Sequence, residues 1–234
     1  MSDIGLVIFD CDGVLVDSEP LAMRVLLEGL GEFGYAIAEE AAYERFLGRS
    51  LANMQAVLRA EYGSELSPDR LERMRQRLFE VYRQELLPIS GVAAMLDRLD
   101  PLAIPRCVAS SSQMERLRVS LEVTGLLPRF TPHLFSATIV AQGKPAPDLF
   151  LHVAERMAVV PKACLVIEDS AAGIEAAQRA GMRVFGFVGG SHARSVAYRA
   201  KLAALAPDLV FDDISRLSAL IGNSAAHRRD RSIR

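Results

Sequence analysis

Two aspartates separated by one residue follow the first apolar run of the 234-residue chain, in the sequence Asp10-Cys11-Asp12-Gly13. The run itself, residues 5–9, is short and continuously apolar, which is typical of a strand buried on both faces of a parallel sheet. Carboxylates this close together repel each other unless a positive group lies near them. Because aspartate and glycine also form polar turns, the motif alone leaves a turn and a functional site equally open.

A second acidic cluster, Glu168-Asp169-Ser170, follows another apolar run at residues 164–167. The carboxyl ends of parallel strands meet at one edge of a sheet, so we expect the acidic residues of both clusters to share one crevice. Three or four clustered carboxylates are the hard oxygen ligands that Mg²⁺ prefers, and without a cation such a cluster is electrostatically costly. The two clusters together predict a magnesium site.

Serines end the apolar run at residues 106–109 and include Ser110 and Ser111. Ser112, with Glu115 three residues later, fits a capping box, so a helix is expected to begin there with its amide groups facing the crevice. Helix N-termini attract anions, and the Ser110 hydroxyl adds a donor. We therefore assign Ser110 and Ser111 to phosphate binding, with a plain helix cap as the alternative interpretation.

Lys144 lies in the sequence Gly143-Lys144-Pro145-Ala146-Pro147-Asp148. The residue before a proline is kept out of helical geometry, and Pro147 near a helix start fixes where that helix begins. Lys144 is therefore expected to be extended and held rigidly. It can supply a positive charge to a phosphate or pair with Asp10 and Glu168, unless it is an ordinary surface lysine.

These residue types are sufficient for phosphoryl transfer through a covalent aspartyl-phosphate. A metal-bound Asp10 stays ionised and attacks phosphorus, while the metal, Lys144 and serine donors stabilise the transition-state charge. If the Asp12 side chain avoids the metal, it can remain protonated, protonate the leaving oxygen, and then take a proton from water. The predicted catalytic residues are Asp10 and Asp12.

The elements that must position these residues alternate between strand and helix patterns, which predicts an α/β fold with a parallel sheet covered by helices on both faces. Apolar runs that read as strands occur at residues 5–9, 106–109, 134–137, 164–167, 183–187 and 209–211. Helical spacing separates most of them, at residues 91–99, 113–123, 147–157, 171–180 and 195–205.

One long interval interrupts the alternation between the first two strand runs. Residues 20–33, 39–46, 51–62 and 69–86 show helical spacing instead, and Ser67-Pro68 is a favourable helix start. We therefore expect a helical domain at 16–87, inserted into a catalytic core of 1–15 and 88–222. Residues 223–234 are rich in serine and arginine and are expected to form a flexible tail.

Composition places the chain among ordinary globular proteins. It is 50% hydrophobic and 24% charged, which excludes a disordered or collagen-like chain. The net charge of −2 does not favour a nucleic-acid partner, and no apolar stretch reaches the length of a membrane helix. The three cysteines cannot form a complete disulfide framework, and no export signal is recognised. We expect a reduced, cytoplasmic, monomeric protein without membrane contact.

The combined motifs resemble the haloacid dehalogenase-like hydrolase superfamily, in the branch of β-phosphoglucomutase and 6-phosphogluconate phosphatase. The matching segments are Asp10-x-Asp12-Gly13, Asp17-Ser18-Glu19-Pro20, Ser110, Lys144-Pro145 and Glu168-Asp169. The resemblance implies a Rossmann-like core with a four-helix cap. It also implies Mg²⁺ bound by the Asp10 carboxylate, the Asp12 main-chain carbonyl and Asp169. Glu168 would then organise the metal's waters or Lys144.

Within this branch, the resemblance favours a phosphatase of small sugar phosphates or phosphorylated sugar acids, closest to the 6-phosphogluconate phosphatases. A sugar-phosphate mutase is the first alternative, but residues 21–24 lack the histidine that the first cap helix of the phosphoglucomutase carries. A phospho-aspartate signalling module is the second, although receivers carry their aspartate after the third strand. Arg49, in the loop that corresponds to the cap's substrate-selecting loop, could meet a carboxylate or second phosphate or make a surface pair.

Overall fold

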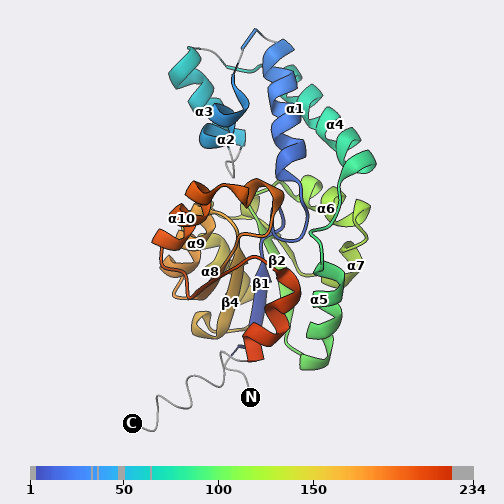
Figure 1. The fold of residues 1–234 in the computed structure, drawn as a ribbon, viewed down its shortest axis with the longest axis vertical. Helices are drawn as coiled ribbons and strands as arrows, with labels where there is room; N and C mark the ends of the chain where they lie inside the picture. The colour runs from blue at the N-terminus through green and yellow to red at the C-terminus, as the bar shows by residue number, and fades with distance from the viewer. Residues whose placement is uncertain (1–3, 33, 36, 47–50, 64, 223–234) are drawn as a thin grey trace.

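The computed structural model describes residues 4–32, 34–35, 37–46, 51–63 and 65–222. Six parallel strands form one sheet in the order β3-β2-β1-β4-β5-β6, which confirms the α/β class (Figure 1). The strands are β1 (Leu6–Phe9), β2 (Arg106–Ser110), β3 (Leu134–Ser136), β4 (Cys164–Glu168), β5 (Arg183–Phe187) and β6 (Leu209–Phe211). The order reverses direction at β1 and β4, and crevices at such switch points bind ligands in open α/β sheets.

Two helical layers cover the sheet because side chains alternate along each buried strand. Val7 and Phe9 of β1 enter one apolar cluster, whereas Leu6 and Ile8 enter the other. One layer contains α5 (Val92–Leu99), α6 (Met114–Val123) and α7 (Leu127–Phe130). The other contains α8 (Asp148–Arg156), α9 (Ala171–Arg179) and α10 (Val196–Ala204) (Figure 1). The predicted two-sided coverage of the sheet is confirmed.

Short 3₁₀ helices complete the core. They are η1 (Asp100–Leu102), η2 (Ala137–Ile139), η3 (Pro161–Ala163), η4 (Ser191–Arg194) and η5 (Ile214–Arg216). The segment η4 follows β5 and packs against the first inserted helix, α1. The core and the insertion therefore pack against each other where η4 contacts α1.

The insertion is helical, as its sequence pattern predicts. It contains α1 (Glu19–Glu32), α2 (Glu39–Phe46), α3 (Leu51–Tyr62) and α4 (Pro68–Glu85). Its own apolar cluster includes the buried side chains of Leu30, Ala42, Phe46 and Leu58. The cluster gives these helices a core separate from the two that flank the sheet, so a four-helix cap is present. Pro68 opens α4 after Ser67, as expected for a proline in the first turn.

The two chain segments that join the insertion to the core lie side by side. Val16 and Pro88 form an antiparallel bridge. The amide of Asp17 donates to the carbonyl of Leu87 at 3.0 Å, and the amide of Ile89 donates to the carbonyl of Leu15 at 2.9 Å. The expected domain boundaries, 15/16 and 87/88, fall in this pair of segments and remain predictions.

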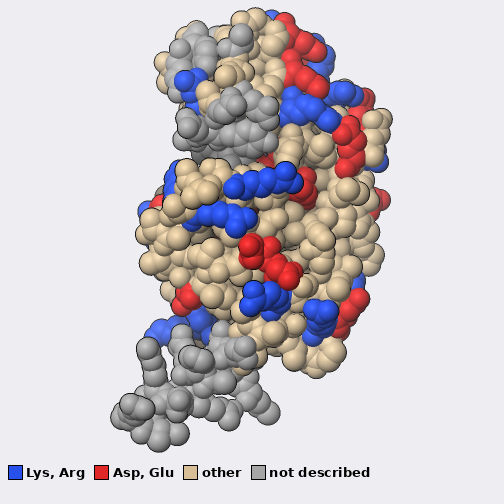
Figure 2. Space-filling view, viewed as in Figure 1, with Lys and Arg blue, Asp and Glu red and all other residues tan. Residues whose placement is uncertain are grey.

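Two regions of interest lie outside the described residues, namely Arg49 and the expected tail at 223–234. Within the part that is described, no helix is both long and apolar enough to span a bilayer. Figure 2 shows basic and acidic side chains interspersed on the visible face of the molecule.

Candidate active site

Strand register brings the two acidic clusters to one edge of the sheet. Phe9, the last residue of β1, is level with Ile167 of β4, and the amide of Asp10 donates to the carbonyl of Ile167 at 3.0 Å. Phe9 is also level with Val108 of β2, which places the serine segment on the opposite side of β1. The sites predicted from separate stretches of sequence therefore share one edge, beyond the carboxyl ends of the strands.

Lys144 joins the two strand ends through a single ammonium group. Its Nζ donates to Oδ1 of Asp10 at 2.6 Å, to Oε1 of Glu168, and to the carbonyl of Ala109 at 3.0 Å. The side chain is only 3% exposed. Burial opposes the charge of this lysine, but the Asp10 and Glu168 carboxylates raise its pKa above the usual value. Of the two roles expected for Lys144, the structure shows the pairing with Asp10 and Glu168.

Glu168 is fixed by donors on its second carboxylate oxygen. Oε2 accepts hydrogen bonds from the amides of Asp169 and Ser170 and from the Ser170 hydroxyl, at 3.1, 3.1 and 3.0 Å. The Ser170 hydroxyl in turn caps α9 by accepting from the amide of Gly173. A Cβ on Gly173 would lie 1.9 Å from Glu168 Cδ, so the close approach requires glycine. Glu168 is thereby held to orient Lys144 and the first turn of α9.

The carboxylate of Asp12 has partners of its own. Oδ1 accepts from the Ser18 hydroxyl at 2.6 Å and from Nη2 of Arg116 at 3.0 Å, and Oδ2 accepts from the Ser112 hydroxyl at 2.6 Å. Burial would raise the pKa of Asp12, but Arg116 and the two hydroxyls lower it below the usual value. This arrangement favours the ionised form of Asp12, and the expectation that Asp12 can remain protonated where its side chain avoids the metal stays a prediction.

The expected capping box at the start of α6 is wrong. The helix begins after Gln113, whose side chain makes no capping bond. The Ser112 hydroxyl donates to Asp12 instead, and the Glu115 carboxylate pairs with Arg75 of α4. A hydroxyl bonds more strongly to a buried carboxylate than to a neutral backbone group, and sequence spacing does not reveal that competing partner.

The predicted phosphate-binding serines lie beside Asp10. Ser110 ends β2 with only 1% of its surface exposed, and its hydroxyl accepts from the amide of Ser112 at 3.0 Å. The carbonyl of Ser112 accepts from the Ser136 hydroxyl of β3 at 2.6 Å, which steadies the loop. Ser111 is partly buried in the same loop. Phosphate binding by Ser110 and Ser111 remains a prediction.

The carboxylate of Asp169 contacts a histidine. Nε2 of His192, from η4, lies 2.9 Å from Oδ2 of Asp169. On the other side, a Cβ on Gly13 would lie 1.9 Å from the same oxygen, so the Asp12–Gly13 backbone approaches Asp169 closely. Gly13 has a φ of 78°, a left-handed conformation that glycine adopts without strain.

The magnesium site predicted from the two acidic clusters stays a prediction. Among the described residues, no three His, Cys, Asp or Glu side chains form a metal-binding group. The Asp12 carboxylate has turned to Arg116, so only its main-chain carbonyl remains available for the predicted ligand set of Asp10, Asp12 and Asp169.

The donors that remain still fit a hard divalent cation. Asp10 and Asp169 are 7% and 5% exposed, and both offer carboxylate oxygens. Burial raises the pKa of Asp10 well above its ordinary range, and Lys144 opposes this. The carboxylates of Glu168, Asp169 and Asp12 raise it further. Lys144 therefore offsets only part of the burial and repulsion that disfavour ionised Asp10, and a divalent cation would relieve them further.

Four residues at the site escaped the sequence reasoning about catalysis. Arg116 and His192 show no local motif, because their partners lie far away in the chain. Ser18 and Glu19 belong to a segment noted only for its resemblance. Burial, then repulsion by Asp12, raises the pKa of Glu19 to about 7, whereas Arg116 lowers it. Glu19 could have been found from its position in the sequence. It lies two residues after Asp17, in the segment through which the chain enters the insertion.

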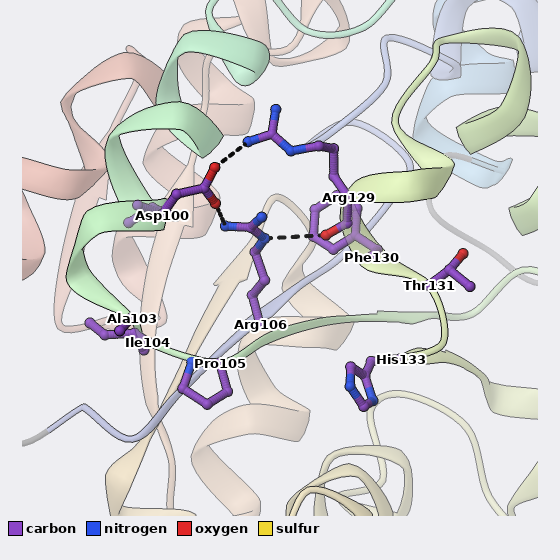
Figure 3. Close-up of a pocket in the computed structure, with 10 residues that line it drawn as sticks. Asp100, Ala103, Ile104, Pro105, Arg106, Arg129, Phe130, Thr131 and His133 are labelled. Carbon is purple, nitrogen blue, oxygen red and sulfur yellow. Dashed lines mark hydrogen bonds and ion pairs between the residues drawn. The ribbon is translucent and has the colours of Figure 1, made fainter.

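A separate hollow of about 330 Å³ opens at the opposite edge of the sheet, near the start of β2 (Figure 3). Two arginines line it and turn toward Asp100. Arg106 donates to Asp100 and to the Arg129 carbonyl, while Arg129 donates to Asp100 and to Asp97. Because these charges are already compensated and the clustered acidic groups lie elsewhere, we place the active site at the carboxyl edge.

Comparison with known proteins identifies the class to which this fold and site belong. Residues 4–181 match the family model described as haloacid dehalogenase-like hydrolase, so the chain belongs to that family. It is 32% identical over 199 residues to the 6-phosphogluconate phosphatase of Escherichia coli, a match that covers 85% of this chain and 89% of that enzyme. These matches confirm the expectation of a phosphatase in this branch of the haloacid dehalogenase-like hydrolases.

Solved structures show the same architecture. A haloacid dehalogenase-like protein of unknown function from Agrobacterium tumefaciens is 38% identical with a TM-score of 0.80, covering 95% of this chain and 99% of that one. A haloacid dehalogenase family hydrolase from Deinococcus radiodurans, solved with bound phosphate and sodium, is 29% identical with a TM-score of 0.76. The match covers 95% of this chain and 97% of that one.

The raised pKa of Glu19 predicts a pH-dependent effect of Glu19→Gln on the metal-free protein. The folded state disfavours ionised Glu19, so the wild type loses stability as pH rises from about 4.5 through about 7. Glu19→Gln has no ionisable group at this position, so it does not lose stability in this way as pH rises. Its stability relative to wild type should therefore increase between pH 4.5 and pH 8, by up to about 3 kcal/mol, in urea denaturation. Glu28→Gln, on an exposed position of the same helix, is the control, and equal effects at both pH values would contradict the prediction.

Arg116→Met is expected to destabilise the protein because it leaves the buried Asp12 carboxylate without its cation. The loss should be about 3–5 kcal/mol near pH 7.5. In the wild type the low pKa of Asp12 stabilises the fold above pH 4, whereas in the variant burial raises that pKa and stability falls as pH rises. Urea denaturation should thus show a smaller loss at pH 4. Arg118→Met, exposed on the same helix, should change stability little at either pH.

Proposed function

We propose that this protein is a Mg²⁺-dependent phosphatase that hydrolyses a small sugar phosphate or phosphorylated sugar acid. The observation that carries the proposal is the Lys144 ammonium bridging Asp10 and Glu168 at the carboxyl edge of the sheet. It fixes an otherwise costly buried carboxylate at the place where α/β folds bind substrates. The family and the named E. coli relative support a phosphate ester as substrate.

Asp10 is the proposed nucleophile. One of its carboxylate oxygens attacks phosphorus, the bond to the leaving oxygen breaks, and an aspartyl-phosphate forms. Lys144 opposes the raised pKa of the reacting carboxylate and holds it in place through its 2.6 Å bond to Oδ1. Donors from Ser110 and Ser111 would hold the phosphoryl oxygens against Lys144, so that charge developing in the transition state meets fixed dipoles and one fixed positive charge.

Asp12 is the proposed acid and base. In the arrangement described, it is ionised and held by Arg116, Ser18 and Ser112, so it is ready to accept a proton but not to donate one. Donation to the leaving oxygen requires that Asp12 take up a proton and turn from these partners. In the second half-reaction, ionised Asp12 accepts the proton of the water that attacks the aspartyl-phosphate.

The cation would be held by the Asp10 and Asp169 carboxylates and the Asp12 main-chain carbonyl, with Glu168 outside this set. When bound, Mg²⁺ supplies positive charge that stabilises the transferring phosphoryl group. Glu168 accepts from Lys144 and from two main-chain amides, so it orders the surroundings of the ion without needing to contact it.

Substrate choice is assigned to the cap. The insertion leaves the core directly after the Asp10 motif, and its first helix begins at Glu19 beside the proposed site. Arg49, outside the described residues, is our proposed contact for a substrate carboxylate or second phosphate. We favour a phosphorylated sugar acid such as 6-phosphogluconate because that is the substrate named for the E. coli relative.

Asp10→Asn is expected to lower phosphate release at least about 1,000-fold because the amide cannot act as the nucleophile. The measurement is phosphate release from a panel of sugar phosphates and phosphorylated sugar acids with Mg²⁺. Asp12→Ala should also lose turnover, and EDTA should abolish it until Mg²⁺ is restored. Asp97→Asn, an exposed aspartate near the opposite hollow, is the control. Near-normal rates for Asp10→Asn would refute the mechanism.

Product analysis is expected to show free phosphate rather than an isomeric sugar phosphate. The segment of α1 that holds Leu21, Met23 and Arg24 carries no histidine, which disfavours the mutase alternative. A hexose 1-phosphate incubated with a trace of the 1,6-bisphosphate separates the two activities. Conversion to the 6-phosphate without release of phosphate would establish a mutase instead.

A further inference from the structure

We propose that His192 is a positioning residue for Asp169, and that it sets the affinity of the site for a divalent cation. The inference rests on the metal site in the proposed function and adds a residue outside the predicted ligand set. His192 lies in η4, after β5, and is 23 positions beyond Asp169 in the chain. Its Nε2 lies 2.9 Å from the Oδ2 of Asp169.

The imidazole of His192 is confined on several sides. Its side chain is 0% exposed. A Cβ on Gly13 or on Gly190 would lie 2.8 or 2.7 Å from the ring carbon Cε1, so both backbones press against the ring. Tyr198 of α10 meets the ring edge to face, with the centroids 5.4 Å apart. A ring confined in this way cannot move far from Asp169.

Bonds to neighbouring elements also fix the backbone that carries His192. The amide and hydroxyl of Ser191 donate to Oδ1 of Asp17 at 3.1 and 2.7 Å. Arg199 of α10 donates to the carbonyls of Ala193 and Val188 at 2.9 and 3.1 Å. Residues on both sides of His192 are therefore anchored, one of them to the segment through which the chain enters the insertion.

Asp169 is held at its backbone as well as at its side chain. Its amide donates to Oε2 of Glu168 at 3.1 Å, and its carbonyl accepts from the Tyr198 hydroxyl at 2.9 Å. With the backbone fixed, the contact with His192 determines how the carboxylate is turned. His192 engages one carboxylate oxygen and leaves the other for a cation, and groups beyond the ligands commonly orient metal-binding side chains in this way.

Packing alone does not account for an imidazole here. Neither ring nitrogen of His192 makes a hydrogen bond of ordinary geometry within the described part of the chain, and the 2.9 Å approach of Nε2 to Asp169 is a charge contact. Burying a polar nitrogen without a partner costs free energy, so an apolar side chain of similar size would serve packing better. The contact with Asp169 is what gives the histidine a function, because a phenylalanine ring could not make it.

Metal binding by the isolated protein tests the proposal directly. Mg²⁺ is titrated calorimetrically into metal-free wild type, His192→Phe, His192→Gln and His192→Asn, and Mn²⁺ binding is followed by electron paramagnetic resonance. The amide nitrogen of glutamine can reach the place of Nε2, whereas that of asparagine falls short. We expect His192→Phe and His192→Asn to bind 10–100-fold more weakly, with His192→Gln near wild type.

Two further readouts separate positioning from a merely structural role. With saturating Mg²⁺, His192→Phe should recover most of the wild-type kcat, because the defect lies in metal affinity. His152→Phe, which replaces a histidine of α8 that meets Phe135 of β3 edge to face, should leave the Mg²⁺ affinity unchanged. The pair His192→Gln and His192→Asn, both polar, decides the question even where the phenylalanine variant fails to fold.

Equal Mg²⁺ affinity of wild type, His192→Asn and His192→Gln would overturn the role of His192 and leave the proposed function standing. Binding of Mg²⁺ by wild type with a loss only of melting temperature in the variants would overturn it in the same way. Failure of the wild type itself to bind Mg²⁺ would remove the metal site from the proposed function, and this inference with it.

Discussion

Burial of Asp10 and Glu168 beside a single lysine is the constraint on which this site depends. Lys144, whose ammonium contacts both, offsets part of the cost of burying these two carboxylates at adjacent strand ends. That arrangement needs the segment after η2 to return across the end of β2, where the Ala109 carbonyl accepts the third bond of the ammonium. The reacting group is therefore placed by electrostatic compensation as much as by strand geometry.

The carboxylates of Asp12 and Asp169 are also held beside a basic side chain, but by different residues. Asp12 is compensated by Arg116 of α6, and Asp169 by His192 of η4. Each partner comes from a separate layer or loop, so the carboxylates of Asp12 and Asp169 are held independently of the Lys144 bridge that Asp10 and Glu168 share. This division explains why Asp10 and Asp12, only two residues apart, differ in the direction of their pKa shifts, raised for one and lowered for the other.

The inserted helices meet the site through the same contacts. Tyr82 of α4 lies beneath the Arg116 guanidinium, with 5.7 Å between the guanidinium carbon and the ring centroid, and Arg75 of α4 pairs with Glu115 of α6. Asp17, in the entering segment, accepts from Ser191 of η4. The cap thus touches the elements that hold Asp12 and Asp169, so the proposed substrate selection by the cap would be linked to the residues proposed for acid–base and metal chemistry.

The sequence by itself determined the strand and helix order, the insertion after β1, and the edge where Asp10, Lys144 and Glu168 meet. These follow from apolar periodicity and from the rule that parallel strands end together. Only the tertiary structure decided that Ser112 bonds Asp12 instead of capping α6, and that Arg116 and His192 serve as partners for carboxylates. The reason is physical: a charge's partner is set by distance in space, and spacing along the chain encodes local geometry alone.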